Sequence, residues 1–559
     1  MDDKPLTVQS DFSLLLDRHS PKFADCRDAL LGFAELSKCL DHFYTYRLTR
    51  LSLWNAAALG VSADKILEVL KSYSRYTIPT VVVSEVKDAC SLYGLLVLEK
   101  IDNQIILRVK DPRFVPLISS ELRVGQELVD TGSSEILVDG KLEHHFSIIE
   151  QARGRVKVRL MKVGLPCEDL AGYQEGESLE VNLKDRSKLR DYQQEATNIF
   201  YAQGSVRGGS GVIVLPCGAG KTMVGIDTLA LLKTKTLILT PSISSLRQWQ
   251  KEILNWTDLK EAQIGEYSGE SKTIAPVTLT TYQLLTSRSK KLDGKMTHLE
   301  KLSQESWGLV IYDEVHLLPA EVFQLASLVQ SRRRLGLTAT LVREDNKEDE
   351  VFTLIGPKKF DLPWKTLEEQ GWIAKANCIE VRVELSPEEK GRVSVANKKE
   401  AYKIAATSDA KLEATVRLLE RHSHEPVLVI GMYLDQLEKL AQRTELPIIT
   451  GATPQKNRDE MFRRYNAGEI RALILSKIGN SAIDLPDAAV AIQISGMFGS
   501  RQEEAQRLGR IVRPKKDGNQ AVFYSLVSRD SPEENFAFRR QLFLVEQGYE
   551  YGVEEFIEG

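Results

Sequence analysis

The chain has 559 residues, with 74 Lys and Arg against 78 Asp and Glu, so its formal net charge is −4. At about 150 residues per domain, this length predicts three or four domains. The balanced charge excludes a nucleic-acid binder that acts as a global polycation, whereas a local basic groove needs no such excess. The six cysteines include no C-x-x-C pair, which argues against a zinc or iron–sulfur site. The polar start, and apolar runs all shorter than the roughly 18 residues of a membrane helix, predict a cytoplasmic protein with no membrane partner.

Residues 1–111 predict an N-terminal appendage. Apolar side chains at helical spacing indicate a helix over 62–74 and a second short helix over 83–90. Leu95–Leu98 and Ile105–Val109 then flank a turn and predict a hairpin. Helix, helix and hairpin are typical of a winged helix that binds DNA or a partner, although a plain packing module gives the same pattern.

Residues 112–182 mix short strands with glycines and predict a small α+β or β-rich domain, which could bind DNA or damaged DNA. From Leu189 onward, short apolar strands alternate with amphipathic helices, the pattern of βαβ units around a parallel sheet. The region is too long for one sheet. We therefore expect two α/β lobes, 183–362 and 363–559, joined near Phe360–Lys375.

A phosphate loop is the strongest local signal. An apolar strand ends at Pro216, Gly218 and Gly220 allow a tight turn, and a helix follows. Lys221 can reach the β- and γ-phosphates of a nucleotide, and the Thr222 hydroxyl can reach Mg²⁺. The nucleotide-binding residues predicted here are Pro216, Cys217, Gly218, Ala219, Gly220, Lys221 and Thr222.

Gly308–His316 is an apolar strand that ends in two carboxylates. Asp313 stands where a carboxylate would hold Mg²⁺, and Glu314 is the neighbouring base that would polarise the attacking water. We expect His316 to couple this site to the rest of the protein. Leu337–Thr340 follows another apolar stretch, and its two hydroxyls suit a relay that touches the acid pair.

An arginine cluster lies in the second lobe, at Gln506–Arg513. Gln506, Arg510 and Arg513 fall on neighbouring helical faces, so these side chains can point together. An arginine delivered across a cleft stabilises the charge on the γ-phosphoryl group. By contrast, Arg332–Arg334 could touch DNA but reads more simply as a solvated turn.

Together these motifs resemble the XPB family of superfamily 2 DNA repair helicases, in a bacterial-type form. The resemblance covers Leu189 to about Tyr551 and rests on the following segments: Leu215–Thr222, Asp313–His316, Leu337–Asp345, Ser476-Lys477, Asp484–Pro486 and Gly499–Arg510. It implies two tandem RecA-like lobes, ATP and Mg²⁺ as cofactors, and a 3′–5′ DNA helicase or translocase that acts in nucleotide excision repair.

The resemblance also implies roles for single residues. Gln193 would read the adenine edge with Arg190 as a helper, and Asp484 would link the second lobe to the nucleotide. The DNA strand would be lined by Thr240, Gln248, Thr281, Arg343, Glu344, Asp345, Thr450 and Lys477. Single-stranded and forked double-stranded DNA would be the partners, with a structure-specific nuclease or another repair protein beside them.

One departure from the family concerns the segment near 385–408, which is short for the helical thumb that some members carry. Three other functions remain open beside a DNA helicase: a duplex DNA translocase without efficient unwinding, an ATP-driven conformational module of a repair or transcription complex, and an RNA helicase.

Overall fold

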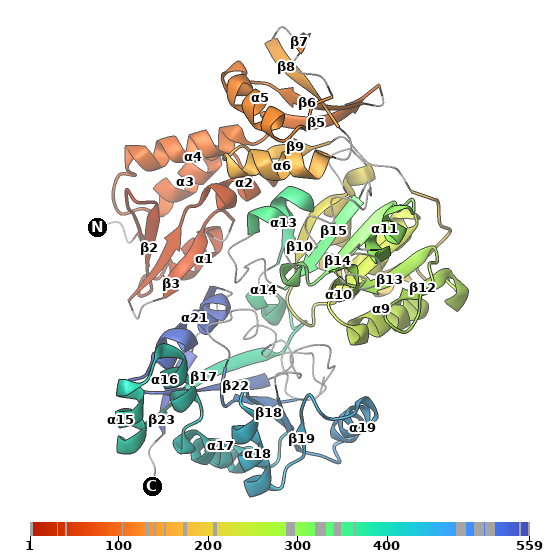
Figure 1. The fold of residues 1–559 in the computed structure, drawn as a ribbon. Helices are drawn as coiled ribbons and strands as arrows, with labels where there is room; N and C mark the ends of the chain where they lie inside the picture. The colour runs from red at the N-terminus through yellow and green to blue at the C-terminus, as the bar shows by residue number, and fades with distance from the viewer. Residues whose placement is uncertain are drawn as a thin grey trace. The chain divides into compact units, whose positions relative to one another are not determined.

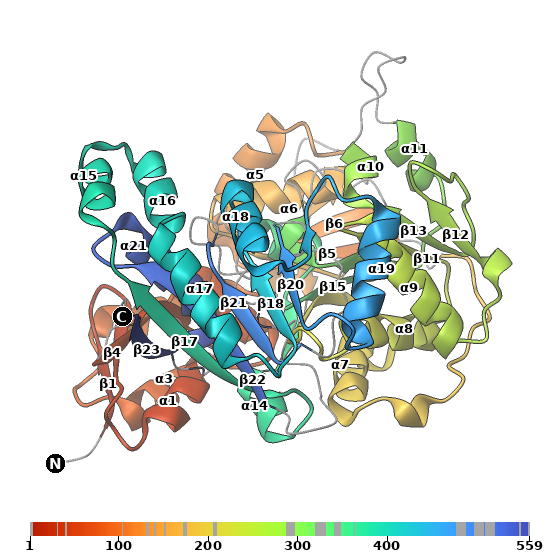
Figure 2. The ribbon, with the colours of Figure 1, turned by 90° about the horizontal axis from the view of Figure 1, so that it is seen from below.

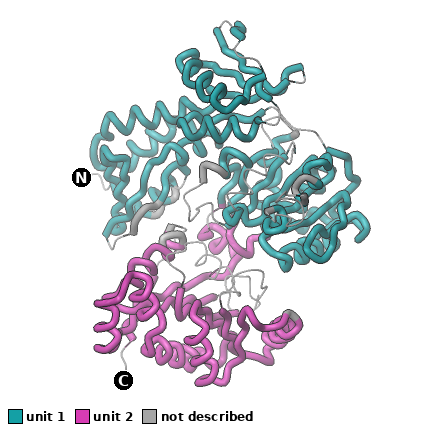
Figure 3. Tube along the Cα trace, viewed as in Figure 1, with its two compact units in different colours: residues 1–214, 221–361 teal, residues 215–220, 362–559 magenta. Residues whose placement is uncertain are grey.

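The computed structural model describes most of the chain. The described residues are 4–30, 32–39, 42–102, 104–129, 134–138, 141–149, 152–170, 176–204, 209–286, 297–318, 331, 333–339, 348–362, 364–476, 488–496, 508, 520–546, 549 and 551–556. None of the helices among them is long and apolar enough to span a lipid bilayer. The chain divides into two compact units, residues 1–214 with 221–361 and residues 215–220 with 362–559 (Figure 3).

The first unit begins with a four-stranded antiparallel sheet in the order β1-β2-β4-β3. Its strands are β1 (Leu6–Val8), β2 (Ser13–Asp17), β3 (Glu35–Cys39) and β4 (Phe43–Arg47), with helix α1 (Phe23–Leu30) between β2 and β3. Helices α2 (Arg50–Ala58), α3 (Ala63–Tyr73) and α4 (Thr80–Leu92) follow. The two helices predicted over 62–74 and 83–90 are confirmed as α3 and α4, whose buried faces carry Ile66, Leu70 and Val86.

A five-stranded sheet follows in the order β7-β8-β6-β5-β9. Its elements are β5 (Leu96–Ile101), β6 (Gln104–Val109), η1 (Pro112–Phe114), α5 (Val115–Val124), β7 (Ser134–Val138), β8 (Lys141–Ile148), α6 (Arg153–Lys162) and β9 (Cys167–Asp169) (Figure 1). The predicted hairpin is confirmed as the antiparallel pair β5–β6. However, β6 also pairs with β8, and β5 with β9, so one sheet continues across the domain limit expected at residue 111. The physical reason is the shared core, in which Leu107 and Phe146 of the sheet pack with Ile118 of α5 and Val156 of α6.

The first lobe is a seven-stranded sheet in the order β12-β13-β11-β14-β15-β10-β16, with every pair parallel. Its strands are β10 (Ser210–Val214), β11 (Thr236–Thr240), β12 (Ile264–Tyr267), β13 (Val277–Thr281), β14 (Leu309–Asp313), β15 (Arg333–Thr338) and β16 (Lys358–Asp361). Its helices are η3 (Arg186–Lys188), α7 (Asp191–Tyr201), η4 (Ala202–Gly204), α8 (Lys221–Leu232), α9 (Ile243–Trp256), η5 (Glu261–Gln263), α10 (Tyr282–Thr286), α11 (Thr297–Ser303), η6 (Val315–Leu317) and α13 (Glu348–Leu354). Strands such as β11 and β13 are buried along their whole length, as expected for a parallel sheet with both faces covered.

The expectation of a solvated turn at Arg332–Arg334 is wrong for its last two residues. Arg333 and Arg334 begin β15, and Arg334 is buried. Its guanidinium donates to the Asp169 carboxylate of β9, which lies in the preceding domain of the same unit. The buried carboxylate gives this arginine a partner that sequence spacing did not reveal.

The second unit holds another seven-stranded parallel sheet, in the order β19-β20-β18-β21-β22-β17-β23. Its strands are β17 (Lys375–Val383), β18 (Val427–Ile430), β19 (Ile448–Ile449), β20 (Ala472–Leu475), β21 (Val490–Gln493), β22 (Gln520–Ser528) and β23 (Tyr551–Phe556). Its helices are α14 (Trp364–Glu369), α15 (Pro387–Val395), α16 (Lys398–Ala406), α17 (Asp409–Arg421), α18 (Leu434–Thr444), α19 (Gln455–Asn466) and α21 (Pro532–Glu546). The short segment predicted near 385–408 is the helix pair α15–α16 (Figure 2).

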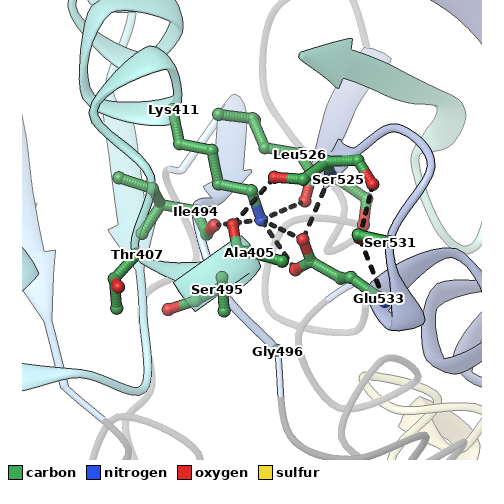
Figure 4. A network of polar contacts seen from close by, with 12 residues as sticks. Ala405, Thr407, Lys411, Ile494, Ser495, Gly496, Ser525, Leu526, Ser531 and Glu533 are labelled. Carbon is green, nitrogen blue, oxygen red and sulfur yellow. Dashed lines mark hydrogen bonds and ion pairs between the residues drawn. The ribbon is translucent and has the colours of Figure 1, made fainter. Parts of the chain in front are cut away.

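A buried ion pair lies in the second lobe. The Lys411 ammonium of α17 lies 2.6 and 2.7 Å from the two carboxylate oxygens of Glu533 of α21, and both side chains are fully buried (Figure 4). The same ammonium donates to the carbonyls of Ile494 at 3.3 Å and Leu526 at 3.0 Å. The pair therefore holds α17 and α21 to the carboxyl ends of β21 and β22. The predicted fold class, two tandem RecA-like lobes behind an N-terminal α+β appendage, is confirmed.

Candidate functional site

The phosphate loop connects β10, which ends at Val214, to α8, which begins at Lys221. Gly218 and Gly220 adopt φ values of +81° and +82°, in the left-handed region where side chains are strained. The Ala219 amide donates to the Pro216 carbonyl at 3.1 Å and closes the turn between them. The loop thus delivers Lys221 and Thr222 at the N-terminus of a helix, which favours an anionic phosphate.

The acid pair lies at the carboxyl end of β14. Asp313 is its last residue, and Glu314 adopts a φ of 49°, an uncommon left-handed conformation for a residue with a side chain. In that conformation, the Glu314 Oε1 lies 3.3 Å from the Lys221 Nζ. The structure thus brings together the lysine and the glutamate that the two motifs predicted separately.

The pKa values of the two carboxylates shift in opposite directions. Burial, reinforced by the Glu314 charge, raises the pKa of Asp313 to about 7. Burial would also raise the pKa of Glu314, but the Lys221 ammonium and His316 lower it below its ordinary value. Two buried acids beside each other cannot both ionise cheaply without a cation. Oxygen ligands of this kind are those that Mg²⁺ prefers, so the residues present fit the ion.

His316 lies in η6 and is buried. Its Nδ1 lies 2.7 Å from the Thr338 hydroxyl at the end of β15 and 3.4 Å from the Glu314 carboxylate. A backbone hydrogen bond from Ala339 also reaches Glu314. The described part of the Leu337–Thr340 element therefore touches the acid pair directly, while Thr340 lies outside the described residues.

Two aromatic side chains complete the surroundings of Asp313. The Trp249 indole of α9 donates to the Asp313 Oδ2 at 3.0 Å, and the Tyr282 hydroxyl of α10 donates to the Asp313 backbone carbonyl at 2.7 Å. Sequence reasoning did not assign these two contacts. Trp249 falls on one helical face with Leu246 and Ile253, a spacing that indicates burial but not its polar partner.

Arg190 and Gln193 form the start of α7. The Gln193 Oε1 accepts a hydrogen bond from the Arg190 backbone amide at 3.0 Å, a capping-box arrangement. The Arg190 guanidinium donates to the Tyr192 hydroxyl at 2.8 Å. These contacts fix the first turn of α7, and the adenine contact of Gln193 stays a prediction.

The residues predicted to line DNA differ in exposure. Gln248 is exposed on α9, whereas Thr240 and Thr281 are buried at the carboxyl ends of β11 and β13. The Thr240 hydroxyl lies within hydrogen-bond distance of the Ser242 and Thr280 carbonyls, at 3.1 and 3.2 Å. In the second lobe, Thr450 is half-buried, and its backbone amide donates to the Thr453 hydroxyl at 3.0 Å. Their DNA contacts stay predictions.

Several predicted site residues lie outside the described residues: Gln506, Arg510, Arg513, Asp484, Lys477, Arg343, Glu344 and Asp345. Among the described residues, Lys221, Asp313, Glu314 and His316 of the first lobe form the candidate nucleotide site.

A lysine that follows a phosphate loop and contacts an acid pair, in a chain with two RecA-like sheets, defines a helicase-class nucleotide hydrolase. Residues 367–558 match the family described as ERCC3/RAD25/XPB C-terminal helicase. Residues 186–343 match the family described as type III restriction enzyme, res subunit, and residues 6–130 match one described as helicase conserved C-terminal domain. That last match falls on the N-terminal appendage despite its description.

The relatives span the whole chain. A protein named DNA 3′-5′ helicase XPB from Mycobacterium tuberculosis is 46% identical over 99% of this chain and 98% of its own length. A protein of the same name from Kineococcus radiotolerans is 47% identical over 99% of this chain and 97% of its own length. Among solved structures, the DNA-bound type ISP restriction-modification enzyme LlaBIII has a TM-score of 0.50 at 14% identity, covering 66% of this chain and 31% of that one, a likeness in fold alone.

A eukaryotic relative carries a longer name. The protein called general transcription and DNA repair factor IIH helicase/translocase subunit XPB, from Enterocytozoon bieneusi, is 31% identical over 98% of this chain and 92% of its own length. The chain belongs to the XPB family of DNA helicases, and it is an enzyme of that class. The predicted resemblance is confirmed over a longer stretch than the motifs alone covered.

Proposed function

We propose that this protein is an ATP- and Mg²⁺-dependent 3′–5′ DNA helicase that moves along DNA and acts in nucleotide excision repair. The observation that supports ATP hydrolysis is the 3.3 Å contact between the Lys221 Nζ and the Glu314 Oε1, beside Asp313. The polarity and the repair role are supported by the names of the relatives, which call them 3′-5′ helicases and repair-factor subunits.

ATP would enter with its phosphates on the loop 216–220. The Lys221 ammonium would then leave Glu314 and pair with the β- and γ-phosphates, because a dianionic phosphate group attracts it more strongly than one carboxylate does. Freed from that ion pair, Glu314 would accept a proton from the attacking water. Thr222 and Asp313 would hold Mg²⁺, which would neutralise charge on the phosphates while water attacks the γ-phosphoryl group and ADP leaves.

The second lobe would complete the reaction. Arg510 and Arg513 would stabilise the charge on the γ-phosphoryl oxygens, with Gln506 and Asp484 linking that lobe to the nucleotide. Repeated binding and hydrolysis would open and close the lobes and step the enzyme along one strand. DNA would be held through its phosphates by Gln248 and Lys477 without sequence readout, so no global positive charge is needed.

The direct test combines ATPase and unwinding on forked DNA with a 3′ or a 5′ tail. We expect DNA-stimulated ATPase and strand displacement only on the 3′-tailed fork, with Lys221→Ala as the inactive control. Stimulated ATPase without a displaced strand on either fork would instead identify a duplex translocase. Stimulation by RNA of the same sequence, equal to that by DNA, would contradict the DNA assignment.

One relative is named as a subunit of transcription and DNA repair factor IIH, which supports action within a multiprotein complex. The resemblance to the family adds a structure-specific nuclease as the partner class that we propose. Co-purification from a lysate with tagged protein, followed by a nuclease assay on forks, would test this partner. A protein that acts only as a conformational module would keep its partner after Lys221→Ala and retain full repair in cells carrying that variant.

A further inference from the structure

Asp313 is held by two donors that come from different elements. The Trp249 indole reaches its carboxylate at 3.0 Å, and the Tyr282 hydroxyl reaches its backbone carbonyl at 2.7 Å. Both aromatic side chains are nearly fully buried, with 1% and 3% of their surface exposed. The predicted magnesium ligand is therefore fixed at both its side chain and its backbone.

Each donor directly follows a residue predicted to line DNA. Trp249 follows Gln248, which is exposed on α9, and Tyr282 follows Thr281 at the end of β13. β11, the strand before α9, lies between β13 and β14 in the sheet, and all three run parallel. Because their carboxyl ends share one edge, the segments that carry the two donors start beside Asp313.

Trp249 also touches the helix that follows the phosphate loop. A Cβ placed on Gly225 of α8 would lie 2.4 Å from the ring carbon Cη2 of Trp249, so the ring packs directly on this glycine. Gly225 stands one turn after Lys221. The indole thus contacts the phosphate-loop helix through its six-membered ring and the acid strand through its N–H.

A buried indole needs an acceptor for its N–H, but a nearby backbone carbonyl is enough. Trp307 is equally buried in the same lobe, and its indole donates at 2.7 Å to the backbone carbonyl of Leu302, five residues earlier in the chain. Trp249 instead donates across 64 positions to a carboxylate of the hydrolysis site. The arrangement forms two short paths from predicted DNA-lining residues to the predicted magnesium ligand.

We propose that Trp249 and Tyr282 are positioning residues that make ATP hydrolysis respond to DNA, by shifting Asp313 when DNA engages Gln248 and Thr281. This inference rests on the proposed DNA-stimulated ATPase. A strand bound along α9 and at the end of β13 moves the two donors. Asp313, which Trp249 holds at its carboxylate and Tyr282 at its backbone carbonyl, moves with them. Without the donors, DNA binds but the acid pair no longer senses it.

The test measures the ratio of ATPase kcat with saturating single-stranded DNA to kcat without DNA. Trp249→Phe keeps the ring and removes the N–H, and Tyr282→Phe removes only the hydroxyl. The free energy of one hydrogen bond to a carboxylate corresponds to about a tenfold change in rate. We therefore expect the stimulation ratio to fall about tenfold in Trp249→Phe. Tyr282→Phe should lower it in the same direction, with DNA affinity in filter binding kept in both.

The matched controls remove hydrogen bonds of the same kind elsewhere in the lobe. Trp307→Phe loses the bond to Leu302, and Tyr267→Phe loses the 3.0 Å contact with His298. Both should keep the wild-type stimulation ratio. Equal stimulation in wild type and in Trp249→Phe would overturn the inference, as would an equal loss in Trp307→Phe.

Failure of the proposed function would look different, because wild-type protein would then show no stimulation by DNA at all. If Trp249→Phe does not fold, as judged by circular dichroism, Tyr282→Phe decides the question alone. Its ring is unchanged, and an undiminished ratio in that variant contradicts the proposal.

Discussion

The Lys157 ammonium of α6 lies 2.8 Å from the Asp169 carboxylate of β9, and both side chains are nearly fully buried. Two further cations, Arg153 and Arg334, share the same carboxylate. Arg334 belongs to β15, which ends at the Thr338 that contacts His316. One acid thus pairs with three buried cationic side chains and joins the five-stranded sheet to the strand beside the acid pair.

We predict that Asp169→Asn destabilises this joint by about 3–5 kcal/mol, because it leaves buried cations without their counter-charge. Native-state hydrogen exchange should show the loss in α6, β9 and β15, while the amides of the second lobe keep their protection. Asp111→Asn is the matched control, since Asp111 pairs with the largely exposed Arg113. Unchanged exchange in α6 and β15 would show that the joint does not depend on this carboxylate.

The same cluster predicts a pH dependence. Burial, opposed by Asp169, lowers the pKa of Lys157 to about 8 from its ordinary 10.5. Between these two pH values the unfolded chain binds more protons than the folded one, so the lysine's contribution to stability rises with pH. Lys157→Met should abolish this rise in the protection of α6 between pH 8 and 10. A rise of the same size in the variant would assign it to another group.

The buried pair in the second lobe predicts a different pattern. Lys411→Met or Glu533→Gln alone leaves one buried group without its partner and should cost about 3–5 kcal/mol. Replacing both, as Lys411→Met with Glu533→Leu, should recover most of that loss because neither member of the pair is left buried without the other. Hydrogen exchange in β21 and β22 measures the coupling, since Lys411 donates to Ile494 and Leu526.

The Arg443–Glu413 pair is a suitable control, because both partners are about half exposed and the geometry is equally short. An exposed pair is worth about 1 kcal/mol or less, so Glu413→Gln should hardly alter exchange in β21. Additive losses in the double variant of Lys411 and Glu533 would argue against the coupling.

Removing the Thr338 hydroxyl should affect ATP hydrolysis and DNA strand displacement to different extents. Thr338→Val keeps the shape of the side chain but removes the hydroxyl that lies 2.7 Å from the His316 Nδ1, and losing this one hydrogen bond should cost about 1–3 kcal/mol. We expect strand displacement on forks to fall more than ATPase, because the catalytic groups stay in place. Thr278→Val in β13, which loses a buried hydrogen bond from the hydroxyl to the Ala275 carbonyl, should leave that balance unchanged. Equal losses of ATPase and unwinding in Thr338→Val would count against a coupling role.

Features formed by residues that are close together in the chain could be predicted from the sequence. Gly218, Gly220 and Lys221 lie within a few residues of one another, so local spacing was enough to predict the phosphate loop. Alternating strands and helices likewise predicted two parallel-sheet lobes, since that pattern repeats along the chain.

Contacts between distant residues were beyond such patterns. The Trp249–Asp313 bond spans 64 positions and the Lys411–Glu533 pair spans 122, so no spacing rule connects them. Arg334 was placed in a solvated turn because charged residues are almost never fully buried without a partner. Its partner Asp169 stands 165 positions away in another domain.

Glu314 offers the most direct test of the chemistry. Glu314→Gln should still bind ATP, because Lys221 and the phosphate loop remain, but it loses the base for the attacking water. A positioned base contributes about 10²–10⁴-fold, so kcat should fall by at least about a hundredfold with little change in ATP affinity. Glu305→Gln is the control, since Glu305 also pairs with a lysine of the same lobe, Lys235, at 2.7 Å. Single-turnover hydrolysis and nucleotide binding separate the two effects, and normal turnover in Glu314→Gln would assign the base to another residue.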